Sequence, residues 1–222
     1  MFLKKIKSEG IAHLSYFLAS GRDAVVIDPR RDVDVYLKTA AENGFNITHI
    51  FETHKNEDYV IGSLPLSKAC GAEIYHGKNF DFDYGNPVSE GDEFEIGKMK
   101  LKVLETPGHT FESISVAVFD PAFGERAVGV FTGDALFVGD VGRTDFFPDQ
   151  AEKVAGMLYD SIFDKILALG DQSIVYPAHG AGSVCGSGMA SREFSTLGYE
   201  RMFNPVLQKT DRNEFVNYKV NE

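Results

Sequence analysis

The sequence predicts an α/β protein in which two β-sheets pack face to face and helices cover their outer faces. Short apolar strand patterns come first, as a meander, and later alternate with helical patterns, which is typical of layered sheets and helices. Single His or Asp residues also follow several of these strands directly. The 222 residues can bury a large core, and no linker or low-complexity tract divides them. We therefore expect a single domain spanning residues 1–222.

The N-terminal third predicts four strands and two helices. Short runs of β-branched, aromatic and aliphatic residues indicate strands at residues 2–7, 14–19, 24–27 and 47–51. Residues 33–43 place apolar side chains on one face and stop at Gly44, which is typical of an amphipathic helix. A second helix is expected at residues 63–69, where Ser63 can cap the first turn and Pro65 lies within it.

The remaining chain predicts further strands, a long loop and two helices. A hairpin is expected around Gly97-Lys98, because apolar runs flank this pair. Residues 133–147 contain many glycines and show no period, so they predict a loop. Apolar residues recur every three or four positions over 151–169, which predicts the longest helix, and Asp211 opens a helix over 210–220. The strands expected here are 73–75, 92–96, 99–104, 114–119, 128–131 and 173–176.

Four polar residues stand at the ends of predicted strands. His54, with Asp58 four residues later, follows the strand 47–51, and each of three later segments carries one His or Asp: Thr106-Pro-Gly-His109, Thr132-Gly-Asp134 and Tyr176-Pro-Ala-His179. One such residue is weak evidence, but a set of imidazoles and carboxylates at neighbouring strand ends predicts a metal site. The histidines that belong to no such motif are interpreted as structural residues: His13, His49 and His76.

Composition excludes several classes of function. The formal net charge is −11 and no basic cluster occurs, which argues against a nucleic-acid-binding surface. No apolar run approaches the ~20 residues of a membrane-spanning helix. Two cysteines cannot form a disulfide framework, so we expect a cytoplasmic protein. Cys70 ends an apolar helix and is assigned to the core. Cys185 follows His179 in a Gly- and Ser-rich stretch, where a structural role and a place facing the site both remain open.

These motifs, taken together, resemble the metallo-β-lactamase superfamily. The series is His54-x-Asn56-x-Asp58-Tyr59, Thr-Pro-Gly-His109, Gly-Asp134 and Ala-His179-Gly. The longer phrases around Asp134, Arg143 and Cys185 are similar to the persulfide dioxygenase branch, notably to the metallo-β-lactamase half of proteins that also carry a rhodanese domain. The resemblance implies the αβ/βα sandwich fold, with two mixed sheets packed face to face, helices outside and a metal at one sheet edge.

Two positions depart from the superfamily pattern. Asn56 and Tyr59 stand where the pattern has histidines, so each zinc ion of a two-zinc hydrolase would lose a nitrogen ligand. The resemblance to the persulfide dioxygenases implies a smaller set of metal ligands, His54, His109 and Asp134, all of which are present. Two histidines and one carboxylate form the facial triad of non-haem iron oxygenases. We therefore expect one Fe(II) per chain, with zinc as a substitute.

The other polar residues are expected around that triad. Asp58 is placed to accept a hydrogen bond from a ligand imidazole, while Asn56, Tyr59 and His179 are candidates for orienting water or substrate. Arg143 is a candidate for pairing with a substrate carboxylate or, equally, for an ion pair with Asp145 or Asp140.

The expected activity is the iron-dependent oxidation of a low-molecular-weight thiol persulfide, such as glutathione persulfide, to sulfite. The alternatives are a metal-dependent thioester hydrolase of the glyoxalase II type and a degenerate, non-catalytic binding protein. The resemblance implies a rhodanese-type sulfurtransferase as a partner. A homo-oligomer is also expected.

Overall fold

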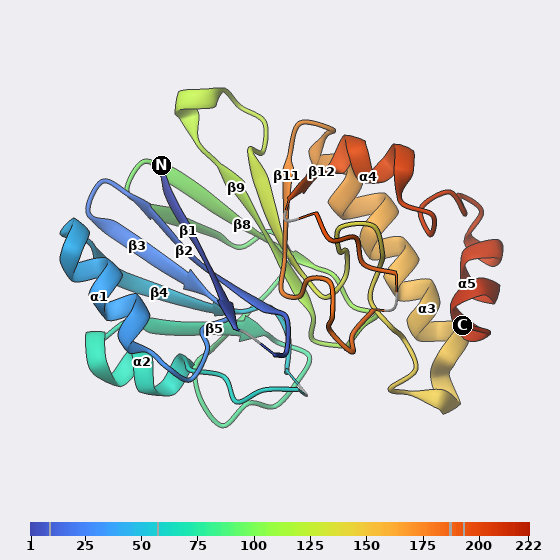
Figure 1. The fold of residues 1–222 in the computed structure, drawn as a ribbon, viewed down its shortest axis with the longest axis horizontal. Coiled ribbons are helices and arrows are strands. Elements are labelled where there is room, and N and C mark those ends of the chain that lie inside the picture. The colour runs from blue at the N-terminus through green and yellow to red at the C-terminus, as the bar shows by residue number, and fades with distance from the viewer. Residues whose placement is uncertain (9, 57, 187, 193) are drawn as a thin grey trace.

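Two six-stranded sheets pack face to face at the centre of the molecule, and helices cover their outer faces (Figure 1). The computed structural model describes residues 1–8, 10–56, 58–186, 188–192 and 194–222. The chain runs through the first sheet and then through the second, so the N-terminal and C-terminal halves form the two sides of the sandwich. This architecture confirms the predicted αβ/βα sandwich of two mixed sheets.

The first sheet holds strands β1 to β6 in sequential order. β1, β2 and β3 form an antiparallel meander, whereas β4, β5 and β6 pair in parallel with their neighbours. The parallel pairs need crossover connections, and helices α1 and α2 occupy two of them. The bounds are β1 Phe2–Ser8, β2 His13–Ser20, β3 Asp23–Ile27, α1 Asp34–Asn43, β4 Asn46–Glu52, α2 Ser63–Cys70, β5 Glu73–Gly77 and β6 Asn86–Val88.

The second sheet has the order β12-β11-β10-β9-β8-β7, in which only β10 and β11 are parallel. Helices α3, α4 and α5 lie on the far side of this sheet (Figure 1). The bounds are β7 Glu93–Ile96, β8 Met99–Glu105, β9 Ile114–Phe119, β10 Gly129–Gly133, α3 Ala151–Asp160, β11 Ile174–Pro177, β12 Ser195–Thr196, α4 Leu197–Phe203 and α5 Arg212–Val220.

Alternation along the strands divides the core into three layers. In β2, Leu14, Tyr16 and Leu18 point between the sheets, whereas Phe17 and Ala19 point toward α1. The layer between the sheets also contains side chains from β3, β4, β8, β9 and β10. A third apolar cluster joins the second sheet to α3 and α5. Burial on both sides of each sheet therefore fixes the sheets and leaves the strand ends to carry polar groups.

The structure corrects several predicted elements. The helix expected over 151–169 is an α-helix only as far as Asp160, and a π-helical segment, Ser161–Ile166, and a 3-10 turn, Leu167–Leu169, continue it. Helix α2 has Gly62 at its N-cap position and Ser63 as its first residue, so Ser63 does not cap it. Strands β6 and β12 and helix α4 were absent from the sequence prediction. The hairpin at Gly97-Lys98 and the helix opened by Asp211 are confirmed.

The structure also bears on the relation to membranes. Among the described residues, every helix is too short or too polar to cross a lipid bilayer.

Candidate metal centre

The ends of four strands meet at one edge of the sandwich. His54 follows β4, His109 follows β8, Asp134 follows β10 and His179 follows β11, as the sequence predicted. All four side chains are buried, with at most 3% of each residue exposed to solvent. Because strands of both sheets contribute, the site lies where the two sheets meet rather than on either sheet alone.

His54, His109 and Asp134 form one compact group of donor atoms. The Nε2 atoms of His54 and His109 lie 3.6 Å and 3.5 Å from the same carboxylate oxygen, Oδ2 of Asp134. All three donor atoms fall within 4.8 Å of one another. The two rings stand almost perpendicular, at 82°. The structure thus brings together the three residues that the sequence analysis selected as metal ligands.

Each triad histidine makes a hydrogen bond through Nδ1, and this bond fixes the orientation of its ring. His109 donates through Nδ1 to the backbone carbonyl of Arg143, at 3.0 Å. His54 Nδ1 lies 2.9 Å from the hydroxyl of Thr53, which in turn donates to the carboxylate of Asp28 at 2.7 Å. Since that hydroxyl proton is used, Thr53 accepts from His54. With each Nδ1 engaged in this way, the Nε2 atoms of both rings point toward Asp134.

These orientations fit a bound divalent metal ion. Burial lowers the pKa of His54 to about 3, so its ring is neutral. Burial alone would raise the pKa of Asp134, but the imidazoles of His179 and His54 hold that pKa well below its usual range. The ionised carboxylate of Asp134 and the Nε2 lone pair of His54 thus face each other without a proton between them. A cation at their centre relieves that repulsion, and two histidines with one carboxylate suit both zinc and non-haem iron.

His179 lies against the outer side of Asp134. Its Nδ1 atom is 2.8 Å and 3.0 Å from the two carboxylate oxygens of Asp134, and its Nε2 atom is 3.0 Å from Oδ2 of Asp58. Burial would lower the pKa of His179, yet the charge of Asp134 raises it to about 10. Asp58 was expected beside a triad imidazole, but the structure places it beside His179. Thr53 and the Arg143 carbonyl hold the triad rings instead.

Asn56 and Tyr59 offer no imidazole to the site, and each makes a contact of its own. The amide nitrogen of Asn56 donates to the backbone carbonyl of His54 at 3.2 Å. The Tyr59 ring packs against His13 in a tilted arrangement, with centroids 3.9 Å apart, and its centroid lies 6.5 Å from that of the His179 ring. Burial raises the pKa of Tyr59 well above its usual value, so the phenol is neutral.

His13 lies in the wall of the site, although the sequence analysis assigned it to structure. It forms an isolated β-bridge with His179, and the two rings are 5.7 Å apart. Burial lowers the pKa of His13 to about 3, with a further contribution from His179. Sequence patterns do not reveal this position, because the bridge joins segments far apart in the chain. The only local signal was a histidine at the start of a strand.

Arg143 and Cys185 flank the site on its solvent side. The guanidinium of Arg143 donates to both carboxylate oxygens of Asp145, at 2.6 Å and 2.5 Å, which matches the ion-pair alternative for this residue. Cys185 is buried and faces the site. Burial, followed by the charge of Asp134, raises the pKa of its thiol to about 12. Both residues line a cavity of about 270 Å³ that also borders Lys219 and Glu222.

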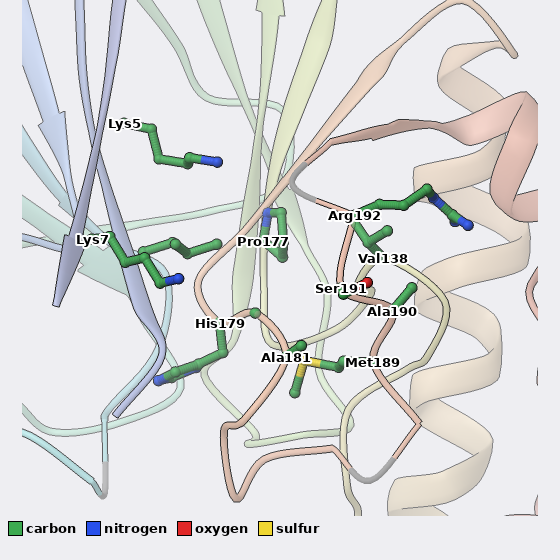
Figure 2. Close-up of a pocket in the computed structure, with 12 residues that line it drawn as sticks. Lys5, Lys7, Val138, Pro177, His179, Ala181, Met189, Ala190, Ser191 and Arg192 are labelled. Carbon is green, nitrogen blue, oxygen red and sulfur yellow. The ribbon is translucent and has the colours of Figure 1, made fainter. Parts of the chain in front are cut away.

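A second cavity, of about 250 Å³, lies on another side of His179 (Figure 2). Lys5 and Lys7, from alternate positions of the edge strand β1, line one side of it. Met189 and the chain that follows it line the opposite side, and Pro177 lies between. The opposite side combines the apolar Met189 and Ala190 with Ser191 and Arg192, so the cavity has cationic side chains on two sides and suits a small anionic molecule.

Fold and site together define a class of α/β sandwich proteins with a metal centre at the joined edge of two sheets. A family model described as the metallo-β-lactamase superfamily matches residues 9–179. The chain therefore belongs to the metallo-β-lactamase superfamily.

Two solved structures match the whole chain closely. A metallo-β-lactamase from Staphylococcus aureus subsp. aureus COL superposes with a TM-score of 0.90 at 34% identity, over 100% of this chain and 67% of that one. ETHE1 from Myxococcus xanthus superposes with a TM-score of 0.85 at 31% identity, over 100% of this chain and 91% of that one. Both likenesses extend beyond the metal ligands to the complete sandwich.

Curated relatives carry two different activities in their names. The mitochondrial persulfide dioxygenase ETHE1 of Bos taurus is 30% identical over 194 residues, which are 84% of this chain and 67% of the relative. A hydroxyacylglutathione hydrolase of Rhodospirillum rubrum is 34% identical over 180 residues, which are 78% of this chain and 63% of the relative. These relatives indicate a metal-dependent enzyme, and they leave an oxygenase and a hydrolase as the two candidates.

Proposed function

We propose that the chain is a mononuclear iron dioxygenase that acts on a low-molecular-weight thiol persulfide. The observation that carries this proposal is the contrast between the intact triad and positions 56 and 59. The donor atoms of His54, His109 and Asp134 converge, whereas the Asn56 amide donates to the backbone carbonyl of His54 and the Tyr59 ring packs against His13. The substitutions thus spare a three-ligand site and remove the imidazoles that a two-zinc hydrolase would use.

In the proposed reaction, one persulfide, one O₂ and one water give one thiol and one sulfite with two protons. Iron would supply the redox chemistry at the triad, and the protein supplies binding, orientation and electrostatics. His54, His109 and Asp134 hold one face and leave the opposite positions open. The cavities beside His179 and Cys185 can admit a small anionic thiol compound, with Lys5 and Lys7 along one of them. The persulfide dioxygenase relative supports this choice of substrate.

The experiment uses protein purified without air. We expect about one iron per chain, O₂ uptake with glutathione persulfide, and release of sulfite in equal amount. The variant His109→Ala should lose both iron and O₂ uptake. The matched control is His49→Ala, because His49 lies outside the site and packs against Tyr75. Iron-loaded protein that neither takes up O₂ nor releases sulfite would contradict the proposal.

Hydrolysis of a thioester is the second candidate, and the hydroxyacylglutathione hydrolase relative favours it. The same preparation should be assayed with S-lactoylglutathione. Turnover with kcat/KM of about 10⁴ M⁻¹s⁻¹ or more, without O₂ uptake, would establish the hydrolase and exclude the oxygenase. Protein that binds no metal and turns over neither substrate would instead indicate a binding protein.

A further inference from the structure

Two lysines of β1 occupy positions at which a sandwich normally places apolar side chains. Along this strand, Leu3 packs into the layer between the sheets, and the alternation of a strand brings Lys5 and Lys7 to the same face. Their cross-strand neighbours in β2, Tyr16 and Leu14, belong to that layer. Both lysine side chains point from β1 toward the cavity of about 250 Å³ (Figure 2). Inward-facing cations therefore form one wall of this cavity.

The cavity is basic although the protein is acidic. The formal net charge of the chain is −11, yet none of the described residues that line the cavity is acidic. The ammonium group of Lys7 makes no hydrogen bond or ion pair with a described residue. Lys5 and Lys7 are two residues apart on one strand, so their Cα atoms lie roughly 6.5 Å apart and the two charges repel each other. An acid group held between them relieves this repulsion.

The opposite wall is mainly aliphatic. Met189 and Ala190 lie there, at the start of the segment that leads to β12 (Figure 2). Arg192 also lines this side, but its guanidinium lies 3.4 Å from the carboxylate of Glu200 and over the ring of Tyr199, so its charge is partly offset. A ligand that fits both walls has an acid group at one end and a short aliphatic part at the other.

Hydrogen bonds fix both walls before any ligand binds. The backbone N–H of Leu14 donates to the carbonyl of Ala178 at 2.7 Å, which ties β2 to the end of β11. The backbone N–H of Ala190 donates to the carbonyl of Val138 at 2.8 Å, which ties the segment before β12 to the loop after β10. A cavity whose walls are already in place binds a small ligand at a lower entropic cost.

This cavity is separate from the one beside Cys185. Among the described residues, the two cavities share no lining residue, and none of the three triad residues lines either of them. His179 lines the lysine cavity, and its Nδ1 atom contacts Asp134 at 2.8 Å. A ligand between the lysines and Met189 therefore has its own walls and does not need the metal.

We infer that this cavity binds a small organic acid, with its acid group at Lys5 and Lys7 and its aliphatic part against Met189. The site goes beyond the proposed oxygenase because it requires neither metal nor persulfide, and its occupant is a second ligand beside any substrate that enters past Cys185. Inward-facing lysines on an edge strand can also serve only to prevent pairing with another strand. That role alone gives the cavity no preference for an acid.

The methyl group of Met189 can report the binding directly. The chain has five methionines, so labelling with [¹³C-methyl]methionine gives few signals, and Met189→Leu identifies the one from Met189. Butyrate is the probe, and butyramide is its neutral counterpart of the same shape. In zinc-loaded protein, which is diamagnetic, we expect butyrate to shift the Met189 signal with a Kd in the millimolar range and butyramide to leave it in place. Met99, which is buried between the sheets, should not respond.

Three variants locate the acid group. Lys7→Gln should weaken butyrate binding by about 10-fold, because one charge-assisted hydrogen bond is lost. Lys4→Gln is the matched control and should bind normally, since Lys4 lies on the same strand but donates to Thr39 of α1 at 2.9 Å. Arg143→Gln should also bind normally, because Arg143 lines the other cavity.

Several results would overturn the inference. They are no response to butyrate in the parent protein, equal responses to butyrate and butyramide, and unchanged binding in Lys7→Gln. Loss of binding in Arg143→Gln would show that the two cavities form one substrate site, and would overturn it as well. None of these results depends on whether the protein oxidises persulfides.

Discussion

The triad and a second group, made of Asp58, His179 and Cys185, lie close together, yet they are built differently. Each triad histidine is held by a second contact, to Thr53 or to the Arg143 carbonyl, and Asp134 directly follows a buried strand. In the second group, Asp58 lies in a loop and Cys185 in a Gly- and Ser-rich segment. The triad therefore has side-chain directions that are set before a metal binds, whereas two of the three residues in the second group are carried by loops. A fixed geometry suits metal-dependent redox chemistry.

The largest effect is expected for Asp134→Ala, because Asp134 serves both groups. Its Oδ2 completes the triad, and both of its oxygens contact Nδ1 of His179. We expect the triad to lose its metal and kcat/KM for persulfide oxidation to fall by about 10³-fold or more, equivalent to about 4 kcal/mol. Metal analysis and O₂ uptake check this. Retention of the full metal content would show that Asp134 is not a metal ligand.

Thr53→Val should weaken the triad alone. The change removes the hydroxyl that accepts from His54 Nδ1 at 2.9 Å while keeping the side-chain volume. Loss of such an orienting contact lowers metal affinity by about 10- to 100-fold. The matched control is Thr48→Val, because the Thr48 hydroxyl lies 2.8 Å from Nδ1 of His49 outside the site. Competition with a chelator measures both affinities, and equal losses in the two variants would contradict the orienting role.

A smaller effect is expected for Arg143→Gln at the entrance to the second group. If Arg143 exchanges its partner Asp145 for a substrate carboxylate, KM rises by about 10-fold with kcat nearly unchanged, since one charge-assisted bond is lost. Steady-state O₂ uptake over a range of persulfide concentrations separates KM from kcat. Arg212→Gln is the control, because Arg212 makes the same two-bond contact with Asp160 away from the site. An unchanged KM would show that Arg143 acts only through its ion pair with Asp145.

The smallest effect is expected for Tyr59→Phe. The Tyr59 hydroxyl is buried and has no hydrogen-bond partner among the described residues, so its removal should leave the free energy of unfolding unchanged or raise it by up to about 1 kcal/mol. Denaturant unfolding measures the difference. A loss of more than about 1 kcal/mol would show that this hydroxyl makes a stabilising contact within the second group.

Local patterns in the sequence predicted the strand ends and hence the triad. His54, His109 and Asp134 each follow an apolar run, and such runs depend on neighbours in the chain. Features set by distant contacts escaped prediction. The two residues of β12 become a strand only by pairing with β11, and His13 reaches the site only through its bridge to His179. Such elements are fixed by tertiary contacts that no local period records.

The π-helical segment escaped for a related reason. Its first residue, Ser161, donates to the carbonyl of Pro107 at 2.8 Å, so a loop from the second sheet contacts the helix where its hydrogen-bond pattern changes. The apolar spacing across residues 151–169 is compatible with a plain α-helix. Cys185 is the opposite case, since its sequence position left two roles open and the fold directs it toward the site.

The contact between the His109 loop and α3 limits how this metal centre could be reused. Gly108 has a φ of +140°, and a Cβ atom on it would lie 2.5 Å from the Cα of Leu158. Leu158 of helix α3 and Ser161, the first residue of the π-helical segment that continues it, both contact this loop, so together they fix its shape. A designer who transplants the triad to another scaffold must therefore bring this helix along. Three ligands copied without it would lose the surface that positions His109.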